Sequence, residues 1–369
     1  MHPFYYILLL ELSLAIIYFM SGVSLGTRNV YSTENLLSPK KNSVYLVFAY
    51  GILLFFHAFR EPYSLLDIPE YADAYKEALG YSWKTVLTEP FYSLKCEMVF
   101  RLIIKVISCL FSSYQMLFII TSIFLIYCIL NATRKYTVFY FVSVMVFLMD
   151  SFAQSLFMLR AFVSIGILLL SFPYIIKRKL IQFLFLNILA MSIHISSVIF
   201  LPVYFLYGIK NPKLLSTISI CLGITFIIYF DYIINLVVDR YFTSYSYYLV
   251  YIDNYEGASW KVPALLGALL VMRFVILKKH FFDFGITRLL SIILVLAFLV
   301  YTAGMGFGLT SRMAMFFTNM TFLILPDTIS HMKNKKIGMT IAVVYIIFTG
   351  FFFLRNCYNS EYINYRLIW

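Results

Sequence analysis

The sequence predicts an all-α fold, a polytopic integral membrane bundle with about ten full spans and one broken helical hairpin. The first observation is composition, because 62% of the 369 residues are hydrophobic and 12% are charged, with a mean hydropathy of +0.87. A soluble domain averages about 45–50% apolar and about 25% charged residues. The second observation is a series of apolar runs near the ~20 residues that a helix needs to cross a bilayer. Together they exclude most classes of cytosolic enzyme.

Apolar runs of spanning length follow one another along the chain, which predicts a single transmembrane domain over residues 1–369. The predicted spans are 4–23, 43–59, 114–132, 137–153, 156–176, 214–232, 262–277, 286–305, 313–330 and 337–354. Segment 180–209 is too long for one span and too short for two. It contains a polar stretch from His194 to Ser197, followed by Pro202, which predicts two half-helices that enter the membrane and return.

The charged residues indicate how the chain is oriented. There are 29 Lys and Arg against 17 Asp and Glu, a formal net charge of +12, and Lys and Arg in short loops stay on the cytoplasmic side of a membrane. If the amino terminus lies outside, one side receives the clusters Arg134-Lys135, Lys177-Arg178-Lys179, Lys210 with Lys213, Lys278-Lys279, and Lys333 with Lys335-Lys336. The positive charge is therefore a topology signal, and no nucleic-acid partner is needed to explain it.

Two longer stretches are predicted to be extracytoplasmic loops, residues 60–113 and 232–261. In the first loop, Asp67-Ile-Pro-Glu70 has the form of a helix capping box, and Gly80 is a natural stop. These signals predict a short helix over residues 68–79.

The same loop contains a second predicted helix over residues 91–112. It carries Glu97, Arg101 and Lys105 at intervals of four residues on an otherwise apolar segment, so the three charges share one face. This amphipathic pattern predicts a helix that lies at the membrane interface or on the bundle.

Charged groups near the spans are candidates for a functional site, because an ionised side chain in the membrane costs at least about 2.5–3.5 kcal/mol on insertion scales. Arg160 and Arg312 lie near the outer ends of predicted spans, and His194 lies at the kink of the broken hairpin. We expect them to converge on an outward-facing cavity, with Arg60 beside it. Several guanidinium groups together match a pyrophosphate, since each offers a planar fork of donors that stays charged.

Each candidate also has a structural interpretation, and the sequence leaves the choice open. Arg160 and Arg312 would snorkel to lipid headgroups. His194 would hydrogen-bond the carbonyl groups of the kink, Arg60 would pair with a neighbouring acid, and Asp67 would serve only as a helix cap. The sequence has no Asp-x-Asp pair, no glycine-rich phosphate loop and no cysteine spacing typical of zinc, so no cofactor or metal is expected.

Six short motifs are spread over most of the chain. They are Phe59-Arg60, Asp67-x-x-x-Tyr71, Glu89-Pro90-x-Tyr92, Leu159-Arg160, Ala190-x-x-x-His194-x-Ser196, and Arg312 before Phe316-Phe317. In this order the chain, roughly from Arg60 to Pro326, resembles the EpsG family, a Wzy-like group of bacterial exopolysaccharide and O-antigen repeat-unit polymerases. One departure is Ala161, because the family commonly has glutamine after the arginine that corresponds to Arg160.

The resemblance implies a GT-C-like or Wzy-like membrane fold and a metal-independent glycosyltransferase without a cofactor. Such a polymerase transfers a growing glycan from undecaprenyl pyrophosphate to the nonreducing end of another lipid-linked repeat unit. The implied location is the bacterial cytoplasmic (inner) membrane, with the active site facing outward. The implied partners are the undecaprenyl-pyrophosphate-linked glycan donor and acceptor, membrane lipids, a chain-length regulator and a flippase of an exopolysaccharide, O-antigen or capsule pathway.

Within this mechanism the matched residues have expected roles. The expected substrate-binding residues are Arg60, Tyr71, Tyr92, Arg160 and Arg312. The expected catalytic residues, which would take the proton of the acceptor hydroxyl or orient the donor, are Asp67, Glu89 and His194. Two other functions fit the same residues. One is a membrane O-acyltransferase of surface glycans with His194 as the base, and the other is a flippase for lipid-linked oligosaccharides.

Overall fold

The computed structural model describes residues 2–20, 43–241, 260–282, 285–303, 308–359 and 362–368. In this part of the chain the regular secondary structure is helical and no strand is formed. The segments that are long and apolar enough to cross a membrane are α6 (Gln115–Tyr136), α9 (Leu159–Ile176), α15 (Ile286–Ala303) and Lys335–Tyr358, which contains α18 (Lys335–Arg355). The prediction of a helical membrane protein is thus confirmed, whereas the count of about ten spans stays a prediction.

The chain folds as two compact units. The first comprises Met1–Pro173, Ile181–Val198 and Thr321–Trp369, and the second comprises Tyr174–Leu180 and Ile199–Met320. That the whole chain forms one transmembrane domain stays a prediction.

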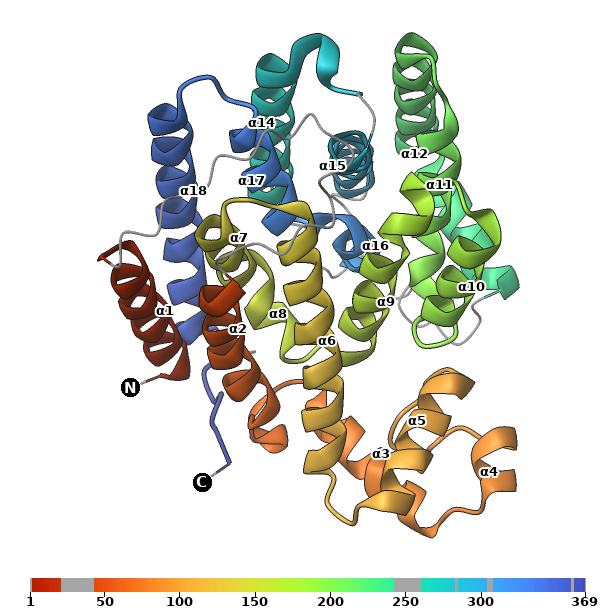
Figure 1. The fold of residues 1–369 in the computed structure, drawn as a ribbon. Coiled ribbons are helices and arrows are strands. Elements are labelled where there is room, and N and C mark those ends of the chain that lie inside the picture. Colours follow the sequence, from red (N-terminus) through yellow and green to blue (C-terminus); the bar gives the residue numbers. More distant parts are fainter. Residues whose placement is uncertain are drawn as a thin grey trace. The chain divides into compact units, whose positions relative to one another are not determined.

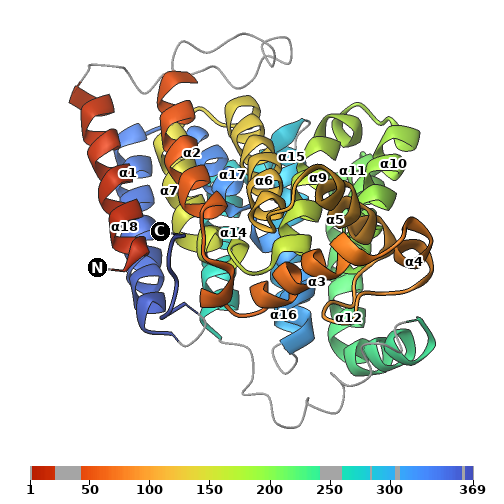
Figure 2. The ribbon, with the colours of Figure 1, turned by 90° about the horizontal axis from the view of Figure 1, so that it is seen from below.

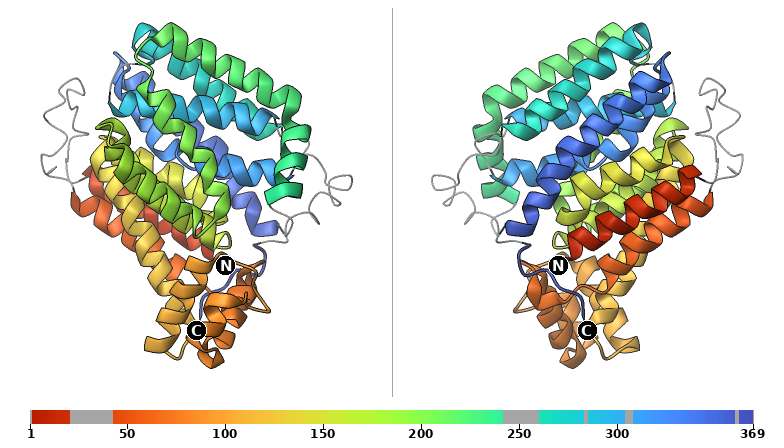
Figure 3. Two further views of the ribbon diagram at one scale, coloured as in Figure 1. Left: turned by 90° about the vertical axis from the view of Figure 1, so that its right-hand side faces the viewer. Right: turned by 90° about the vertical axis from the view of Figure 1, so that its left-hand side faces the viewer.

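The first unit is built around α6. The elements packed around it include α1 (Pro3–Met20), α2 (Ser43–Ala58), α7 (Tyr140–Phe147), the π-helix η3 (Leu148–Phe152), α8 (Ala153–Ser155), α17 (Thr321–Ser330) and α18. Helix α2 packs against α1 and α6, and α17 packs against α7 and α18 (Figures 1 and 3). A hydrogen bond of 2.7 Å between the hydroxyl groups of Tyr50 and Thr133 joins α2 to α6 inside this apolar core.

Short helices form a separate layer of the first unit at the amino-terminal end of α6 (Figures 1 and 2). They are η2 (Pro62–Ser64), α3 (Ile68–Gly80), α4 (Trp83–Thr88) and α5 (Met98–Leu110). Helix α5 packs against α3 and α4. It is shorter than the predicted helix over 91–112, and its Arg101 and Lys105 are buried. Lys105 Nζ donates to the carbonyl oxygen of Ala78 at 2.8 Å, so the polar face of α5 points toward α3.

Helix α3 begins at the predicted residue, but the predicted capping box is wrong. Asp67 is the N-cap, yet its side chain makes no capping hydrogen bond. The reason is its backbone, which has φ = 61° in the left-handed region, whereas a capping residue has an extended backbone that aims its side chain at the helix. The helix ends at Gly80, next to the predicted end at Leu79.

The predicted break at His194 is confirmed. Helix α10 (Leu180–Met191) ends before it, and η4 (Ile195–Phe200) and α11 (Leu201–Gly208) follow it. Within the predicted span 313–330 the helix is interrupted, because α16 (Gly308–Thr318) ends before α17 begins, and the crossing of the membrane by this segment stays a prediction. At the interruption, the side-chain amide of Asn319 donates to the carbonyl oxygen of Met315 at 2.9 Å. It thereby shares this oxygen with the backbone N–H of Asn319, which donates to it at 3.2 Å.

The second unit is centred on α15. Its other elements are α11, α12 (Pro212–Tyr241), α14 (Lys261–Leu277), η7 (Lys278–His280) and α16, and α15 contacts α11, α12, α14 and α16 (Figure 3). Buried Arg273 links α14 to α15 by donating to Ser291 Oγ at 2.9 Å and to the carbonyl oxygen of Thr287 at 2.8 Å. Most of the predicted loop 232–261 lies outside the described residues, although α12 extends into its start.

Candidate functional site

The central contact of the candidate site is an ion pair between α5 and α9. Arg160 lies in the first turn of α9, and Glu97 is the residue directly before α5. Arg160 Nη1 donates to Glu97 Oε2 at 2.6 Å, and the two side chains are only 14% and 18% exposed. Shielding from water weakens solvent screening, so this pair is stronger than an ion pair on the surface.

The second oxygen of Glu97 reaches the break of the hairpin. Glu97 Oε1 accepts a hydrogen bond from the backbone N–H of Ile195 at 2.9 Å and lies 3.8 Å from His194 Nδ1. Although Glu97 is the N-cap residue of α5, its side chain makes no capping hydrogen bond. A cap contributes about 1 kcal/mol to helix stability, and Glu97 instead joins α5 to α9 and to His194.

Tyr71 holds Arg160 from the other side. Its hydroxyl oxygen accepts a hydrogen bond from Arg160 Nε at 3.3 Å, and its ring packs edge-to-face on Phe100 with the ring centroids 5.8 Å apart. Burial raises the pKa of Tyr71, although the Arg160 charge opposes the shift. The phenol therefore stays neutral at physiological pH, and its O–H remains a donor for a ligand.

The four residues Tyr71, Glu97, Arg160 and His194 are called the Glu97 cluster below. Arg160 has five N–H donors, and its hydrogen bonds within the described residues engage Nε and Nη1 but not Nη2. The guanidinium group is thus fixed in orientation and keeps donors for an anion. Burial raises the pKa of Glu70, nearby Asp67 raises it further and Arg160 lowers it. These two acids therefore lie within electrostatic reach of the cluster.

Arg60 occupies a different environment, beneath the carboxy-terminal segment. It is fully buried, its Nη1 donates to the carbonyl oxygen of His57, and its guanidinium carbon lies 4.9 Å from the centre of the Phe118 ring. Antiparallel backbone hydrogen bonds cover it, from Glu61 N–H to Arg366 at 2.9 Å and from Ile368 N–H to Phe59 at 3.0 Å. These contacts stabilise the fold, and a role of Arg60 in substrate binding stays a prediction.

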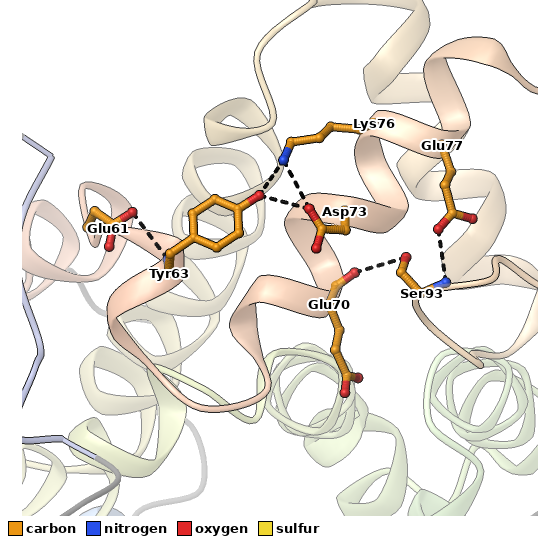
Figure 4. A network of polar contacts seen from close by, with 7 residues as sticks. All are labelled: Glu61, Tyr63, Glu70, Asp73, Lys76, Glu77 and Ser93. Atoms are coloured by element: carbon orange, nitrogen blue, oxygen red, sulfur yellow. Dashed lines mark hydrogen bonds and ion pairs between the residues drawn. The ribbon is translucent and has the colours of Figure 1, made fainter.

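The remaining predicted residues of the first unit lie outside the Glu97 cluster. No hydrogen bond or ion pair within the described chain connects the cluster to Asp67, Glu89 or Tyr92, and all three are exposed. The residues after Glu89 are nevertheless ordered by α3. Glu77 accepts a hydrogen bond from the backbone N–H group of Tyr92 at 2.7 Å. It accepts a second one from the backbone N–H group of Ser93 at 2.9 Å (Figure 4).

Arg312 lies on α16 in the second unit and is half-buried. Its predicted convergence with Arg160 stays a prediction, since the two residues belong to different units. Within the described residues, no group of three or more His, Cys, Asp and Glu side chains is placed to hold a metal ion.

Sequence reasoning missed Glu97 and Glu70 as site residues. The sequence pattern predicts Glu97 on the polar face of an amphipathic helix, whereas its carboxylate binds an arginine 63 residues further along the chain. The one signal in the sequence is its position directly before an apolar helix, at the predicted membrane surface. Glu70 was assigned to the capping box, which does not form.

The fold and the site together define a class, a membrane-embedded helical protein with a shielded arginine oriented beside a histidine. Comparison with known proteins adds the family. The model of the EpsG family matches residues 43–367, which include every residue of the Glu97 cluster. The chain belongs to the EpsG family, and this membership supports a general role as a Wzy-like polysaccharide polymerase. No curated protein and no solved structure gives a significant match.

Proposed function

We propose that the protein is a polysaccharide polymerase that joins undecaprenyl-pyrophosphate-linked oligosaccharide repeat units on the outer face of the bacterial cytoplasmic membrane. The observation that carries the proposal is the orientation of Arg160, which is held by Glu97 and Tyr71 and keeps donors for an anion. The remaining side of the guanidinium group matches the acceptor geometry of a phosphate. Membership of the EpsG family supports a polymerase of this general kind.

The position of the Glu97 cluster along the spans supports an outward-facing site. Arg160 lies at the amino-terminal end of α9, and Lys177 follows its carboxy-terminal end, about 25 Å away along the helix axis. Helix α6 likewise has Arg134 and Lys135 in its last turn, at the end opposite α5. Because clusters of Lys and Arg stay on the cytoplasmic side of a membrane, the Glu97 cluster is expected on the opposite, outer side.

In the proposed reaction, the acceptor hydroxyl oxygen forms a bond to the anomeric carbon of the donor glycan. The bond from this carbon to the pyrophosphate breaks, and undecaprenyl pyrophosphate leaves with the electron pair. Arg160 stabilises the negative charge that develops on the leaving group, and Arg312 is its proposed partner. We assign the proton of the acceptor hydroxyl to His194, because a carboxylate oxygen of Glu97 at 3.8 Å stabilises the imidazolium that forms.

Guanidinium groups take the part of a metal ion in this proposal, so the enzyme is metal-independent and needs no cofactor. The catalytic roles predicted for Asp67 and Glu89 are kept as the alternative assignment of the base. A chain-length regulator and a flippase are the proposed partners in the membrane, because one limits the product and the other supplies the substrate.

The test compares variants in a deletion strain that carries the gene on a plasmid. Arg160→Lys keeps the charge and loses the bidentate fork, and Arg160→Ala loses both. We expect both variants to insert into the membrane and to yield single repeat units on the cell surface in place of a polymer ladder. Arg134→Lys, at the opposite end of α6, is the matched control and should give the normal ladder.

The alternative functions give different outcomes in the same strains. Loss of a flippase traps single units on the inner face of the membrane. Loss of an O-acyltransferase leaves the polymer length unchanged and removes acyl groups from the sugars. Polymer of full length from both Arg160→Lys and Arg160→Ala would rule out the proposed role of this arginine.

A further inference from the structure

Tyr92 exposes its aromatic ring to the surroundings, although its backbone is fixed. Tyr92 is 94% exposed, so its ring contributes little to the packing of the protein. Its backbone is nevertheless fixed, because the N–H groups of Tyr92 and Ser93 each donate to one carboxylate oxygen of Glu77, at 2.7 and 2.9 Å. Hydrogen bonds to a charged acceptor are about twice as strong as those between neutral groups. Glu77 thus fixes the backbone that carries the ring.

This segment is continuous with the Glu97 cluster along α3. Ser93 Oγ lies 3.5 Å from the carbonyl oxygen of Glu70 (Figure 4), and Glu70 precedes Tyr71, which binds Arg160. Glu70 and Glu77 are seven residues apart, so they lie on one face of the helix. We call the set Glu70, Glu77, Tyr92 and Ser93 the α3 strip.

The charge of this region indicates the kind of ligand. Segment 61–97 has seven acidic and three basic residues, a net charge of −4 in a chain whose net charge is +12. A negative surface repels phosphate groups and anionic lipid headgroups. Carboxylates accept hydrogen bonds from hydroxyl groups, and an exposed tyrosine ring offers a rigid apolar face for the C–H side of a sugar ring. Both features match a glycan without acidic sugars.

We propose that the α3 strip binds the sugar chain of the acceptor substrate, with the Tyr92 ring stacked on a sugar and the carboxylate of Glu70 bonded to its hydroxyl groups. Glu77 is a positioning residue, which acts through the backbone of Tyr92 and Ser93. This inference rests on the proposed polymerase function. It also predicts that the bound stretch of glycan is uncharged or carries amino groups, since uronic acids would meet the net charge of −4.

The first experiment is photo-crosslinking in the strain that produces the polysaccharide. A photoreactive phenylalanine replaces Tyr92, and the crosslinked protein is stained for carbohydrate after purification. Tyr127 on the spanning helix α6 is 60% exposed and provides the control position, which should crosslink to lipid only. A carbohydrate-positive band at position 92 is expected. A crosslink to lipid alone would show that the Tyr92 ring is an interfacial anchor and would overturn the inference. The absence of any carbohydrate on the protein crosslinked at position 92 would also overturn it.

The second experiment measures the polymerase in proteoliposomes with lipid-linked repeat units extracted from the producing strain. Tyr92→Ala should raise the KM for the acceptor about ten-fold and leave kcat unchanged, because only uniform binding is lost. Tyr92→Phe keeps the ring and should raise the KM less than Tyr92→Ala does, and Tyr127→Ala is the control that should leave both constants unchanged. Glu77→Ala should reproduce the effect of Tyr92→Ala, and the double variant should add nothing to it. An unchanged KM in Tyr92→Ala would overturn the inference.

Failure of this inference differs from failure of the proposed function. One outcome is that the ladder depends on Arg160, while Tyr92→Ala and Glu77→Ala leave the KM unchanged and position 92 crosslinks to no glycan. The acceptor then does not bind here, and the proposed polymerase function stands. If position 92 crosslinks to glycan while every Arg160 variant still makes polymer, the glycan-binding surface stands and the proposed role of Arg160 fails.

Discussion

Glu97→Gln tests whether the ion pair with Arg160 holds the candidate site together. The substitution keeps the shape of the side chain and removes its charge. Glutamine has one acceptor oxygen, so it satisfies either Arg160 Nη1 or the N–H of Ile195, and its amide nitrogen then faces the other donor. Removing one partner of a buried ion pair costs about 3–5 kcal/mol, and exposed pairs contribute about 0–1 kcal/mol. With 14% and 18% exposure, we expect a loss of about 2–3 kcal/mol.

The assay is a double-mutant cycle of unfolding free energies in detergent micelles. Glu97→Gln and Arg160→Gln are measured separately and together, and the coupling energy of the pair should reach about 2 kcal/mol. The chain offers a matched control in Asp73 and Lys76, an ion pair of 3.0 Å whose side chains are 47% and 53% exposed (Figure 4). Its cycle with Asp73→Asn and Lys76→Gln should give less than about 1 kcal/mol.

The reasoning would be refuted by a coupling energy of the Glu97 pair no larger than that of the Asp73 pair. Such a result would mean that water screens Arg160 despite its low exposure, and that Glu97 does not orient it. A large coupling together with normal polymer in Glu97→Gln cells would instead limit Glu97 to a structural role. We expect Glu97→Gln to reduce polymerisation as strongly as Arg160→Lys, because the first variant misplaces the guanidinium group and the second removes it.

Three further predictions concern stability, measured in the same unfolding assay. Asp67→Gly should stabilise the protein by about 0.5–1 kcal/mol, because the side chain makes no cap and φ is 61°. Gly338→Ala should destabilise it by about 1–3 kcal/mol, because a Cβ there would lie 2.7 Å from Ile329 Cγ2. Burial raises the pKa of Glu77, but hydrogen bonds from Ser93 and Tyr92 outweigh it and hold the pKa below its ordinary value. The stabilisation by Glu77 is therefore complete above the unfolded pKa of about 4.3 and is lost as the pH falls through the lower folded pKa, an effect that Glu77→Gln should abolish.

The sequence predicts those features that depend on neighbouring residues. The apolar runs locate α2, α9, α15 and α18 to within a few residues, because the hydrophobic length of a helix is a local property. The break at His194 is equally local, since polar residues and Pro202 follow one another there. The interruption at Asn319 has as its signal only the short polar stretch of Thr318, Asn319 and Thr321, which an apolar average over the span conceals.

The contacts of the candidate site depend on the tertiary fold, and the sequence does not contain them in local form. Glu97 and Arg160 are 63 residues apart, and Glu97 and Ile195 are 98 apart. Arg160 and His194 are predicted to meet because both are polar groups in apolar surroundings. Their counter-charge is not predicted, because seven acids lie between residues 61 and 97 and only the packing of α5 against α3 selects Glu97.

Arg60 and Arg160 show why residue type alone does not define a site of this kind. Each is an arginine at the end of an apolar helix, and a buried guanidinium group needs compensation in either place. Arg60 obtains part of it from the carbonyl oxygen of His57 at the end of α2 and from the Phe118 ring, while its Nε and Nη2 atoms stay buried without a hydrogen-bond partner among the described residues. Arg160 obtains it from the charged carboxylate of Glu97, which binds Nη1, and from the hydroxyl group of Tyr71, which binds Nε. Arg60→Lys should therefore impair folding more than polymerisation per folded molecule, and Arg160→Lys the reverse, when polymer yield is divided by the amount of protein in the membrane. Equal losses of specific activity in the two variants would place Arg60 in the substrate site after all.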